Sequence, residues 1–270
     1  MKILKTVYTL VLALALLITM AACGNNGLPA GNGSGTGSVP RSAGSQAGSE
    51  SSQPAKTPAA MDMKICTVNG SSVRGVGLSE AYSEVYDFSC APEQLSGAEA
   101  PLPGMVVEIG FDGTVLETWP AQIHADTVTF KEQQTDYFSL YYQILEDILK
   151  EDDGLNGDVS KFGFDLTEVS ALSESEKQLL AFEFSSAHGV ESLQGTLREL
   201  MDEGYIDEEN LYWEDGLHFT IEEKEVKSGK VTYSVQKWRS GLGVAGYSNT
   251  ASLDKNGQWV FAEITDMWIS

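Results

Sequence analysis

The sequence predicts an α+β protein, with a small β-barrel module followed by a module of helices and an antiparallel sheet. Residues 61–133 contain several short strand-like stretches and at most one helix, a pattern that favours a small barrel. Residues 134–270 begin with apolar residues at helical spacing and end with four strand-like stretches. Helices followed by a meander are typical of a sheet with helices on one face.

The chain begins with the pattern of a secretory signal peptide. Lys2 and Lys5 precede an uncharged run over residues 6–22, and small residues come directly before Cys23. The run is just long enough to span a bilayer, so an uncleaved anchor is the less favoured alternative. A signal peptide over residues 1–22 predicts that the rest of the chain is extracytoplasmic.

The residues around Cys23 resemble a known lipidation motif. Met20-Ala21-Ala22-Cys23-Gly24 is similar to the lipobox of bacterial lipoproteins, in which leucine usually stands where this chain has Met20. The resemblance implies that Cys23 receives diacylglycerol and becomes the mature N-terminus. Two acyl chains would then anchor the protein to the outer face of the cell membrane. The alternative is a plain secretory signal.

Residues 23–60 are predicted to hold the lipid attachment and a disordered tether. After Cys23 the segment contains eight Gly, seven Ser and four of the eight Pro of the chain, and it has no aromatic residue. Such a segment buries too little apolar surface to offset its conformational entropy. We expect it to act as a spacer.

Acidic residues outnumber basic residues throughout residues 61–270. The formal net charge is −22, from 17 Lys and Arg against 39 Asp and Glu, and removal of Lys2 and Lys5 with the signal makes it −24. A field of this sign repels phosphate backbones, so nucleic-acid binding is excluded. Besides the membrane at the lipid anchor, glycans, cationic peptides, divalent cations and surface proteins remain admissible partners. Solubility is the simpler explanation of the charge.

Cys66 and Cys90 are the two cysteines that remain after Cys23. In an exported protein such a pair suggests a disulfide, which would close a loop of about 24 residues. Two buried, inert thiols are the equal alternative, because pairing depends on geometry that the sequence does not give.

The first module contains clear strand signals and one ambiguous segment. Residues 78–89 fit either a helix or a strand. Asp112-Gly113 lies between two strand-like runs, which is the strongest short-range signal for a hairpin. The predicted strands cover residues 63–68, 104–111, 114–119 and 121–130, with a turn at Asn69-Gly70 and a break at Pro120.

Part of this module resembles a known domain. The residues are Gly104-x-x-Val107-x-Ile109, then Glu117-Thr118-Trp119-Pro120-Ala121-Gln122, then Ala125 and Val128. They are similar to a small β-barrel domain of unknown function found in Gram-positive surface lipoproteins, from which this chain departs at Thr118 and Trp119. The resemblance covers about 25 residues and implies a barrel related in shape to the OB-fold. It implies no activity.

The second module contains three predicted helices before its strands. An aromatic and aliphatic stripe predicts a helix from Phe138 to Leu149. Ser173 and Glu176 form a capping box that opens a second helix, which stops at Gly189. A third helix is predicted to carry Leu193, Leu197, Leu200 and Met201, with Gly204 as its C-cap.

The remaining residues predict an extended sheet. A short strand is expected at residues 161–166, and four more follow as a meander near residues 217–221, 231–235, 244–253 and 258–268. The order of elements looks like a cystatin-like or NTF2-like arrangement. Sheets of that kind often curl around a pocket.

Most motifs for catalysis are absent or out of context. Gly241, Gly243 and Gly246 form a literal G-x-G-x-x-G, but no helix is predicted after it, so a bend in a strand is the better interpretation. Residues 152–158 resemble a worn calcium loop, but Gly154 and Gly163 stand at two positions where oxygen ligands are needed, so a solvated helix terminus is favoured. No catalytic residue, metal site or cofactor is predicted.

Tryptophans are concentrated near the C-terminus. Trp213, Trp238 and Trp259, with Arg239 beside Trp238, are the candidate contacts for a ligand or partner, because an indole suits glycan stacking and protein interfaces. A tryptophan-rich core is the favoured alternative for these indoles. Arg239 could equally form a structural ion pair.

Two functions are compatible with these features. The first is a lipid-anchored binding or interaction module at the cell surface without catalytic activity. The alternative is an extracytoplasmic hydrolase that acts on cell-wall glycan or peptide through carboxylates. A cleft with two carboxyl groups about 5–10 Å apart would favour the hydrolase.

Overall fold

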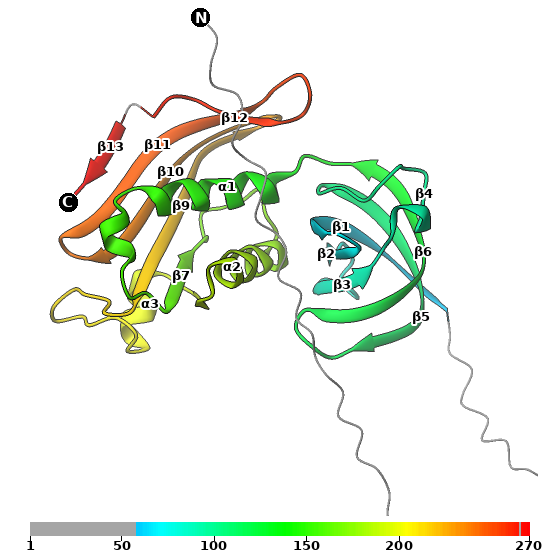
Figure 1. Ribbon diagram of the computed structural model, residues 1–270, viewed down its shortest axis with the longest axis horizontal. Helices are drawn as coiled ribbons and strands as arrows, with labels where there is room; N and C mark the ends of the chain where they lie inside the picture. Colours follow the sequence, from blue (N-terminus) through cyan, green and yellow to red (C-terminus); the bar gives the residue numbers. More distant parts are fainter. Residues whose placement is uncertain (1–57, 265) are drawn as a thin grey trace, which may run out of the picture. The chain divides into compact units, whose positions relative to one another are not determined.

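The structure is a computed structural model that describes residues 58–264 and 266–270. The predicted signal peptide, Cys23 and the predicted tether up to residue 57 lie outside the described residues. The described residues all belong to one compact unit. Within it, Figure 1 shows a closed barrel and a second, open sheet covered by helices. The first strand begins at Ala59, so the last two residues assigned to the tether are part of the barrel.

Five strands close into the barrel. β1 pairs with β2 and β2 with β3 in an antiparallel meander, β5 pairs with β1 and β6, and β6 returns parallel to β3. This confirms the small barrel that the sequence predicts. The elements are β1 (Ala59–Asn69), β2 (Ser72–Gly77), β3 (Val85–Ser89), the 3-10 helix η1 (Pro92–Gln94), the short strand β4 (Leu95–Ser96), β5 (Met105–Leu116) and β6 (Ala121–Gln133).

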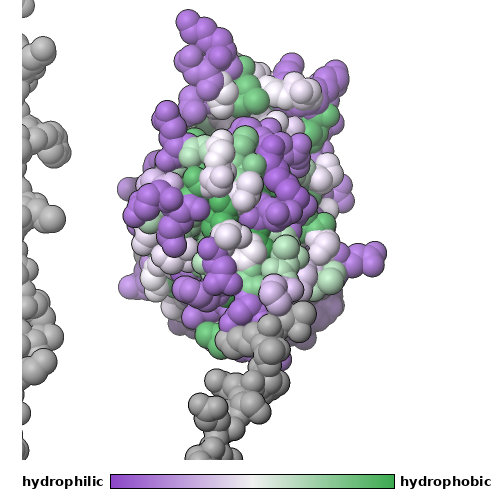
Figure 2. Space-filling model, turned by 90° about the vertical axis from the view of Figure 1, so that its right-hand side faces the viewer, coloured by the Kyte–Doolittle hydropathy of each residue, from purple (hydrophilic) through white to green (hydrophobic). Residues whose placement is uncertain are grey.

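Alternation along the strands fills the barrel. Met63 and Ile65 of β1 and Val107 and Ile109 of β5 are buried and point into the same core cluster, as the period of two along a strand requires. On the outside, hydrophilic and hydrophobic residues are interspersed, as the view of the barrel side in Figure 2 shows.

One local prediction for the barrel needs correction, and one open alternative is decided. Asp112-Gly113 does not turn a hairpin: β5 runs through it to Leu116, and the residues bulge out of the ladder between Phe111 and Val115. The side chain of Asp112 accepts a hydrogen bond from Thr114 N, which holds the bulge. Closing a small barrel bends its strands, and bulges provide that bend. In the ambiguous segment 78–89, only Val85–Ser89 is regular, as a strand.

The second sheet has seven strands, covered on one face by α1 and α2. Its path is β12-β11-β10-β9-β7-β8, and β13 also pairs with β11. The elements are α1 (Tyr137–Lys150), the 3-10 helix η2 (Asp153–Asn156), β7 (Lys161–Asp165), α2 (Glu174–His188), β8 (Glu191–Gln194), α3 (Leu197–Asp202), β9 (Gly216–Lys227), β10 (Lys230–Ser240), β11 (Gly243–Leu253), β12 (Trp259–Phe261) and β13 (Asp266–Ile269).

The helix signals in this module are mostly confirmed. The capping box of α2 is present, with Ser173 and Glu176 bonded to each other's backbone, and Gly189 ends the helix in the left-handed region. The predicted third helix is wrong at its start. Leu193 lies in β8, and α3 begins after Thr196, which forms its own capping box with Glu199.

The sheet is larger than the predicted meander because β7 and β8 join it in parallel. β7 pairs with β9, and β8 pairs with β7 at the edge. Each reaches its place through a helical crossover, which is how parallel strands are connected. Periodicity along one segment does not show such pairings.

Helix α2 also contacts the barrel. Lys64 of β1 forms an ion pair with Glu176 at 2.7 Å, and both side chains are almost fully buried. Arg74 of β2 forms an ion pair with Glu183 at 2.6 Å. Cys66, on the outside of the barrel, joins the core cluster of the helices. The face of β1 and β2 toward α2 is therefore covered by the chain itself.

The structure contains both cysteines as free, buried thiols. Cys66 belongs to the core cluster of the second module, whereas Cys90 belongs to the barrel interior. Of the two alternatives that the sequence leaves open, the structure shows the pair of buried thiols. Burial raises the pKa of the Cys66 thiol well above its usual value, which makes it a poor nucleophile.

Candidate functional site

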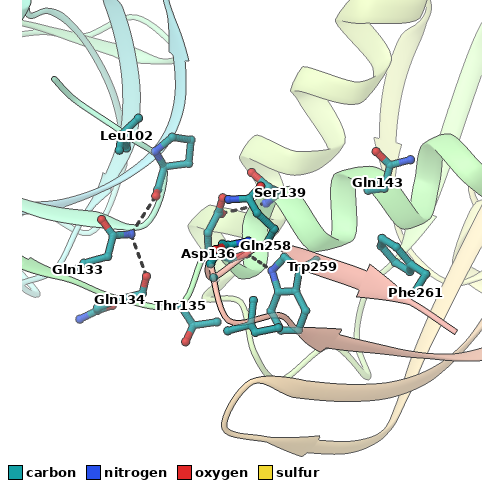
Figure 3. Close-up of a pocket in the computed structure, with 14 residues that line it drawn as sticks. Leu102, Gln133, Gln134, Thr135, Asp136, Ser139, Gln143, Gln258, Trp259 and Phe261 are labelled. Carbon is teal, nitrogen blue, oxygen red and sulfur yellow. Dashed lines mark hydrogen bonds between the residues drawn. The ribbon is translucent and has the colours of Figure 1, made fainter.

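A groove of about 910 Å³ lies on the second module beside the barrel. It lies where the end of β6, the start of α1 and the hairpin between β11 and β12 meet. Leu102 and Pro103, from a loop of the barrel, form one end of the groove. Figure 3 shows Leu102 and Gln133 at one end of the group and Gln143 and Phe261 at the other.

The hairpin side of the groove is held by Asp254. Its carboxylate accepts hydrogen bonds from the backbone N–H groups of Asn256 and Gln258, at 2.8 and 2.9 Å, and its own N–H donates to Gln258 O at 2.8 Å. These donors lower the pKa of Asp254, so the carboxylate stays ionised and the turn stays closed. The turn positions Gln258 and Trp259 against the groove.

The opposite side is held by the start of α1. The carboxylate of Asp136 caps the helix by accepting from Ser139 N at 3.0 Å, and Trp259 Nε1 donates to Asp136 O at 2.7 Å. The Trp259 ring also packs against Tyr137, with centroids 5.7 Å apart. Dashed lines in Figure 3 mark both hydrogen bonds. The half-buried indole is thereby fixed in one orientation.

The groove is almost uncharged in a strongly acidic protein. Among its lining residues Asp136 is the one ionisable group, and that carboxylate is committed to the cap of α1. Hydroxyl groups and two aromatic rings add to the polar and apolar surface. Five lining side chains are amides, namely Gln133, Gln134, Gln143, Asn256 and Gln258. Amides both donate and accept hydrogen bonds, so the site is suited to neutral, polar ligands.

The other candidate contact residues have structural positions. Trp213 and Trp238 are 1% and 6% exposed and pack with Leu200 and Ile206 in a small core cluster. Arg239 donates to the backbone carbonyls of loops rather than to a carboxylate. For these three residues the structure shows the core and structural roles, and Trp259 alone of the four lies in the groove.

The calcium-like loop is occupied by a lysine. The ammonium group of Lys237, which is fully buried, donates to the carbonyls of Leu149, Glu151 and Asp152 and to Asn156 Oδ1. A cation from β10 thus takes the position that a metal would take among these oxygens. Within the residues that the structure describes, no group of three or more His, Cys, Asp or Glu side chains could hold a metal ion.

The glycine motif has a structural explanation. Gly241 lies in the turn between β10 and β11 and Gly243 opens β11, while Gly246 lies under the Trp268 ring. A Cβ at position 246 would be 2.5 Å from that ring. The motif therefore serves a tight turn and a close approach, as the interpretation of a bent strand expects.

Comparison with known proteins adds no family. No protein-family model matches the chain, and no curated protein matches it either. Across residues 58–264 and 266–270, no helix is both long and apolar enough to cross a bilayer.

Sequence reasoning missed most of the groove. Its amides are spread from Gln133 to Gln258, and isolated Gln and Asn residues give no periodic or motif signal. The turn Asp254–Gly257, which falls between the predicted strands near 244–253 and 258–268, marks one wall, but the sequence does not show that α1 lies opposite it.

Proposed function

We propose that this chain is a lipid-anchored, extracytoplasmic binding module without catalytic activity, and that the groove is its ligand site. One observation carries the proposal: the groove combines amides, hydroxyls and a fixed indole with almost no charge. Glycans offer hydroxyl groups and apolar ring faces, which match amides and an indole. The favoured ligand class is therefore a neutral oligosaccharide at the cell surface.

The fold supports a site in the groove rather than elsewhere. Three meander strands with β5 returning beside β1 make a Greek key, and the five-stranded closure supports an OB-like barrel. The face of strands two and three, where OB-folds bind oligomers, is contacted here by α2 through Arg74 and Glu183. A ligand in the groove would not disturb the contact between α2 and the barrel, because neither Arg74 nor Glu183 lines the groove.

A cystatin-like or NTF2-like second module remains a proposal, and its pocket would lie between helices and sheet. In this chain that space is filled by aromatic rings whose centroids are 5.1–6.4 Å apart, from Phe162, Phe164, Phe184 and Phe219. A ligand there would have to displace a packed core.

The alternative hydrolase is less well supported. A glycosidase needs two carboxyl groups across the scissile bond, one with a raised pKa. The groove offers Asp136 alone. Elsewhere, Lys161 and Lys224 lower the pKa of Asp215 and Glu222, which keeps those carboxylates ionised and unsuited to donate a proton.

The groove is tested by thermal shift of the full-length chain in detergent against oligomers of N-acetylglucosamine. A ligand at 100 times its dissociation constant adds about 2.7 kcal/mol to the free energy of unfolding, which raises Tm visibly. Gln258→Ala should weaken binding about tenfold, because one ligand hydrogen bond is worth about 1–1.5 kcal/mol.

The matched control for this test is Gln194→Ala, which removes an exposed amide from β8, outside the groove. It should leave the affinity unchanged. Equal affinity of the Gln258→Ala variant and the wild type would sink the assignment of the groove. A reducing-end product released from the oligomer would favour the hydrolase instead.

The anchor is tested separately by phase partition. The wild-type protein, expressed in a bacterium, should enter the detergent phase, and Cys23→Ser should move it to the aqueous phase because no acyl chain can be attached. Labelling with radioactive palmitate checks the modification itself. Recovery of the unlabelled wild type in the aqueous phase would contradict lipidation at Cys23.

A further inference from the structure

Three apolar side chains are exposed together at one end of the second sheet. We call Leu211, Tyr212 and Leu242 the apolar tip; they are 47%, 41% and 86% exposed. The segment between α3 and β9, yellow in Figure 1, lies beside the orange turn between β10 and β11. Gly241 N donates to Leu211 O at 2.8 Å, which joins the two segments.

The backbone beneath the apolar tip is ordered by hydrogen bonds. Asp207 and Tyr212 exchange two backbone hydrogen bonds, at 3.0 and 3.2 Å, and Trp213 N donates to Arg239 O at 2.9 Å. The next side chain along the chain, Trp213, is buried in a core cluster with Leu200 and Ile206. The tip is therefore presented in a fixed conformation, which reduces the entropy lost when a partner binds.

Leu211 has an unfavourable backbone conformation. Its φ is +48°, in the left-handed region that a leucine avoids because its Cβ crowds the backbone. A glycine would remove the strain, yet the position carries a large apolar side chain that is half exposed. Strain combined with an exposed apolar side chain points to a contact role rather than to stability.

The chain segment that carries Leu211 and Tyr212 is strongly acidic. No Lys or Arg occurs between Arg198 and Lys224. Residues 200–216 contain seven acids, namely Asp202, Glu203, Asp207, Glu208, Glu209, Glu214 and Asp215. Arg198 and Lys161 pair with three of them, Asp202, Glu208 and Asp215. Hydrogen bonds from Asn210 lower the pKa of Asp207, so this carboxylate is also ionised. Leu211 and Tyr212 of the apolar tip therefore lie in a segment of net negative charge.

We propose that the apolar tip is the docking point for a cationic segment of a partner protein, in which apolar side chains are flanked by Lys or Arg. An apolar centre excludes water while complementary charges at the rim guide and orient the partner. An anionic lipid surface fits poorly, because its headgroups would meet the acidic segment. The site is separate from the groove and does not depend on its ligand.

The probe is a short, fluorescently labelled amphipathic peptide of leucine and lysine, titrated with the full-length chain in detergent. Anisotropy should show saturable binding that weakens with salt, because exposed charges are screened. Leu242→Ser should weaken it about tenfold, as expected for truncation of a central contact. Leu116→Ser, which removes an equally apolar, 54% exposed side chain from the barrel, should leave it unchanged.

Leu211→Gly separates a contact role from a structural one. The substitution relieves the positive φ, so Tm should rise, while the lost side chain should weaken peptide binding. A structural role for Leu211 would instead lower Tm. Opposite signs of the two changes support the proposal, and binding that persists unchanged overturns it.

Two further outcomes overturn the proposal. One is equal binding of the peptide to the wild type and the Leu242→Ser variant, which would show attraction by general acidity alone. The other is binding of protein-free vesicles of phosphatidylglycerol and phosphatidylethanolamine that is lost in the Leu242→Ser variant, which would assign the apolar tip to a membrane. The Cys23→Ser variant serves in the vesicle assay, so that the lipid anchor does not contribute.

Discussion

The free energy of unfolding is expected to fall steeply above pH 10. Burial raises the pKa of Tyr141, Tyr233 and Tyr247 well above the usual value of a tyrosine, and each side chain is at most 1% exposed. The Tyr141 hydroxyl donates a hydrogen bond to Glu223, which raises the pKa of this tyrosine further. Above pH 10 the unfolded chain releases these protons while the folded chain keeps them, so stability is lost as the pH rises.

The expected slope is large. Each retained proton is worth about 1.4 kcal/mol per pH unit, so three give about 4 kcal/mol per unit, a substantial part of the stability of an ordinary domain. Lys237 acts in the opposite direction at lower pH. Burial lowers the pKa of Lys237 to about 8. Above that pH the folded chain has released this proton while the unfolded chain still holds it, so the free energy of unfolding rises with pH until the lysine of the unfolded chain is also neutral. The net fall therefore starts above pH 10.

Urea unfolding followed by circular dichroism at increasing pH measures this slope. Tyrosinate absorbance should appear together with unfolding, because the buried hydroxyls ionise when the fold opens. Tyr233→Phe removes one of the three protons and should reduce the slope by about 1.4 kcal/mol per pH unit. Tyrosinate formation by the buried residues in a folded protein, or an unchanged slope in the variant, would contradict the prediction.

Lys237→Met is expected to cost about 3 kcal/mol or more of the free energy of unfolding at neutral pH, because an unsatisfied buried acceptor costs about 1–3 kcal/mol and this lysine serves several. The ammonium group donates to three carbonyls and one amide oxygen at the end of α1, and the methionine leaves all four oxygens without this donor. An unsatisfied buried acceptor loses its hydration without compensation. The loop around residues 149–157 should become mobile first.

The matched control is Lys230→Met on the same strand, where the lysine is exposed. It should change stability by less than about 0.5 kcal/mol. Urea unfolding of both variants measures the difference, and hydrogen exchange over residues 149–157 reports the loop. Equal free energies of unfolding for the two variants would contradict the prediction, because water would then satisfy the four oxygens as well as Lys237 does.

The sequence alone predicted features that depend on neighbours in the chain. Three such features depend on residues that are close in sequence: the capping box at Ser173 and Glu176, the helix stop at Gly189 and the apolar stripe of α1. Their spacing along the chain is enough to predict how the side chains are arranged on the helix. Alternation in β9, β10 and β11 predicted the meander, because consecutive strands pair through short turns. The signal peptide and lipobox at Cys23 are also local patterns, and they stay predictions.

Tertiary structure decided everything that depends on distant residues. Asp112-Gly113 became a bulge because β5 had to bend around a closed barrel, and Leu193 entered a strand because β7 offered a free edge. Lys237 reached the loop after α1, and the groove amides met across residues 133–258, by folding alone. Local spacing carries no information about which segments meet, since that is set by the burial of apolar faces across the whole chain.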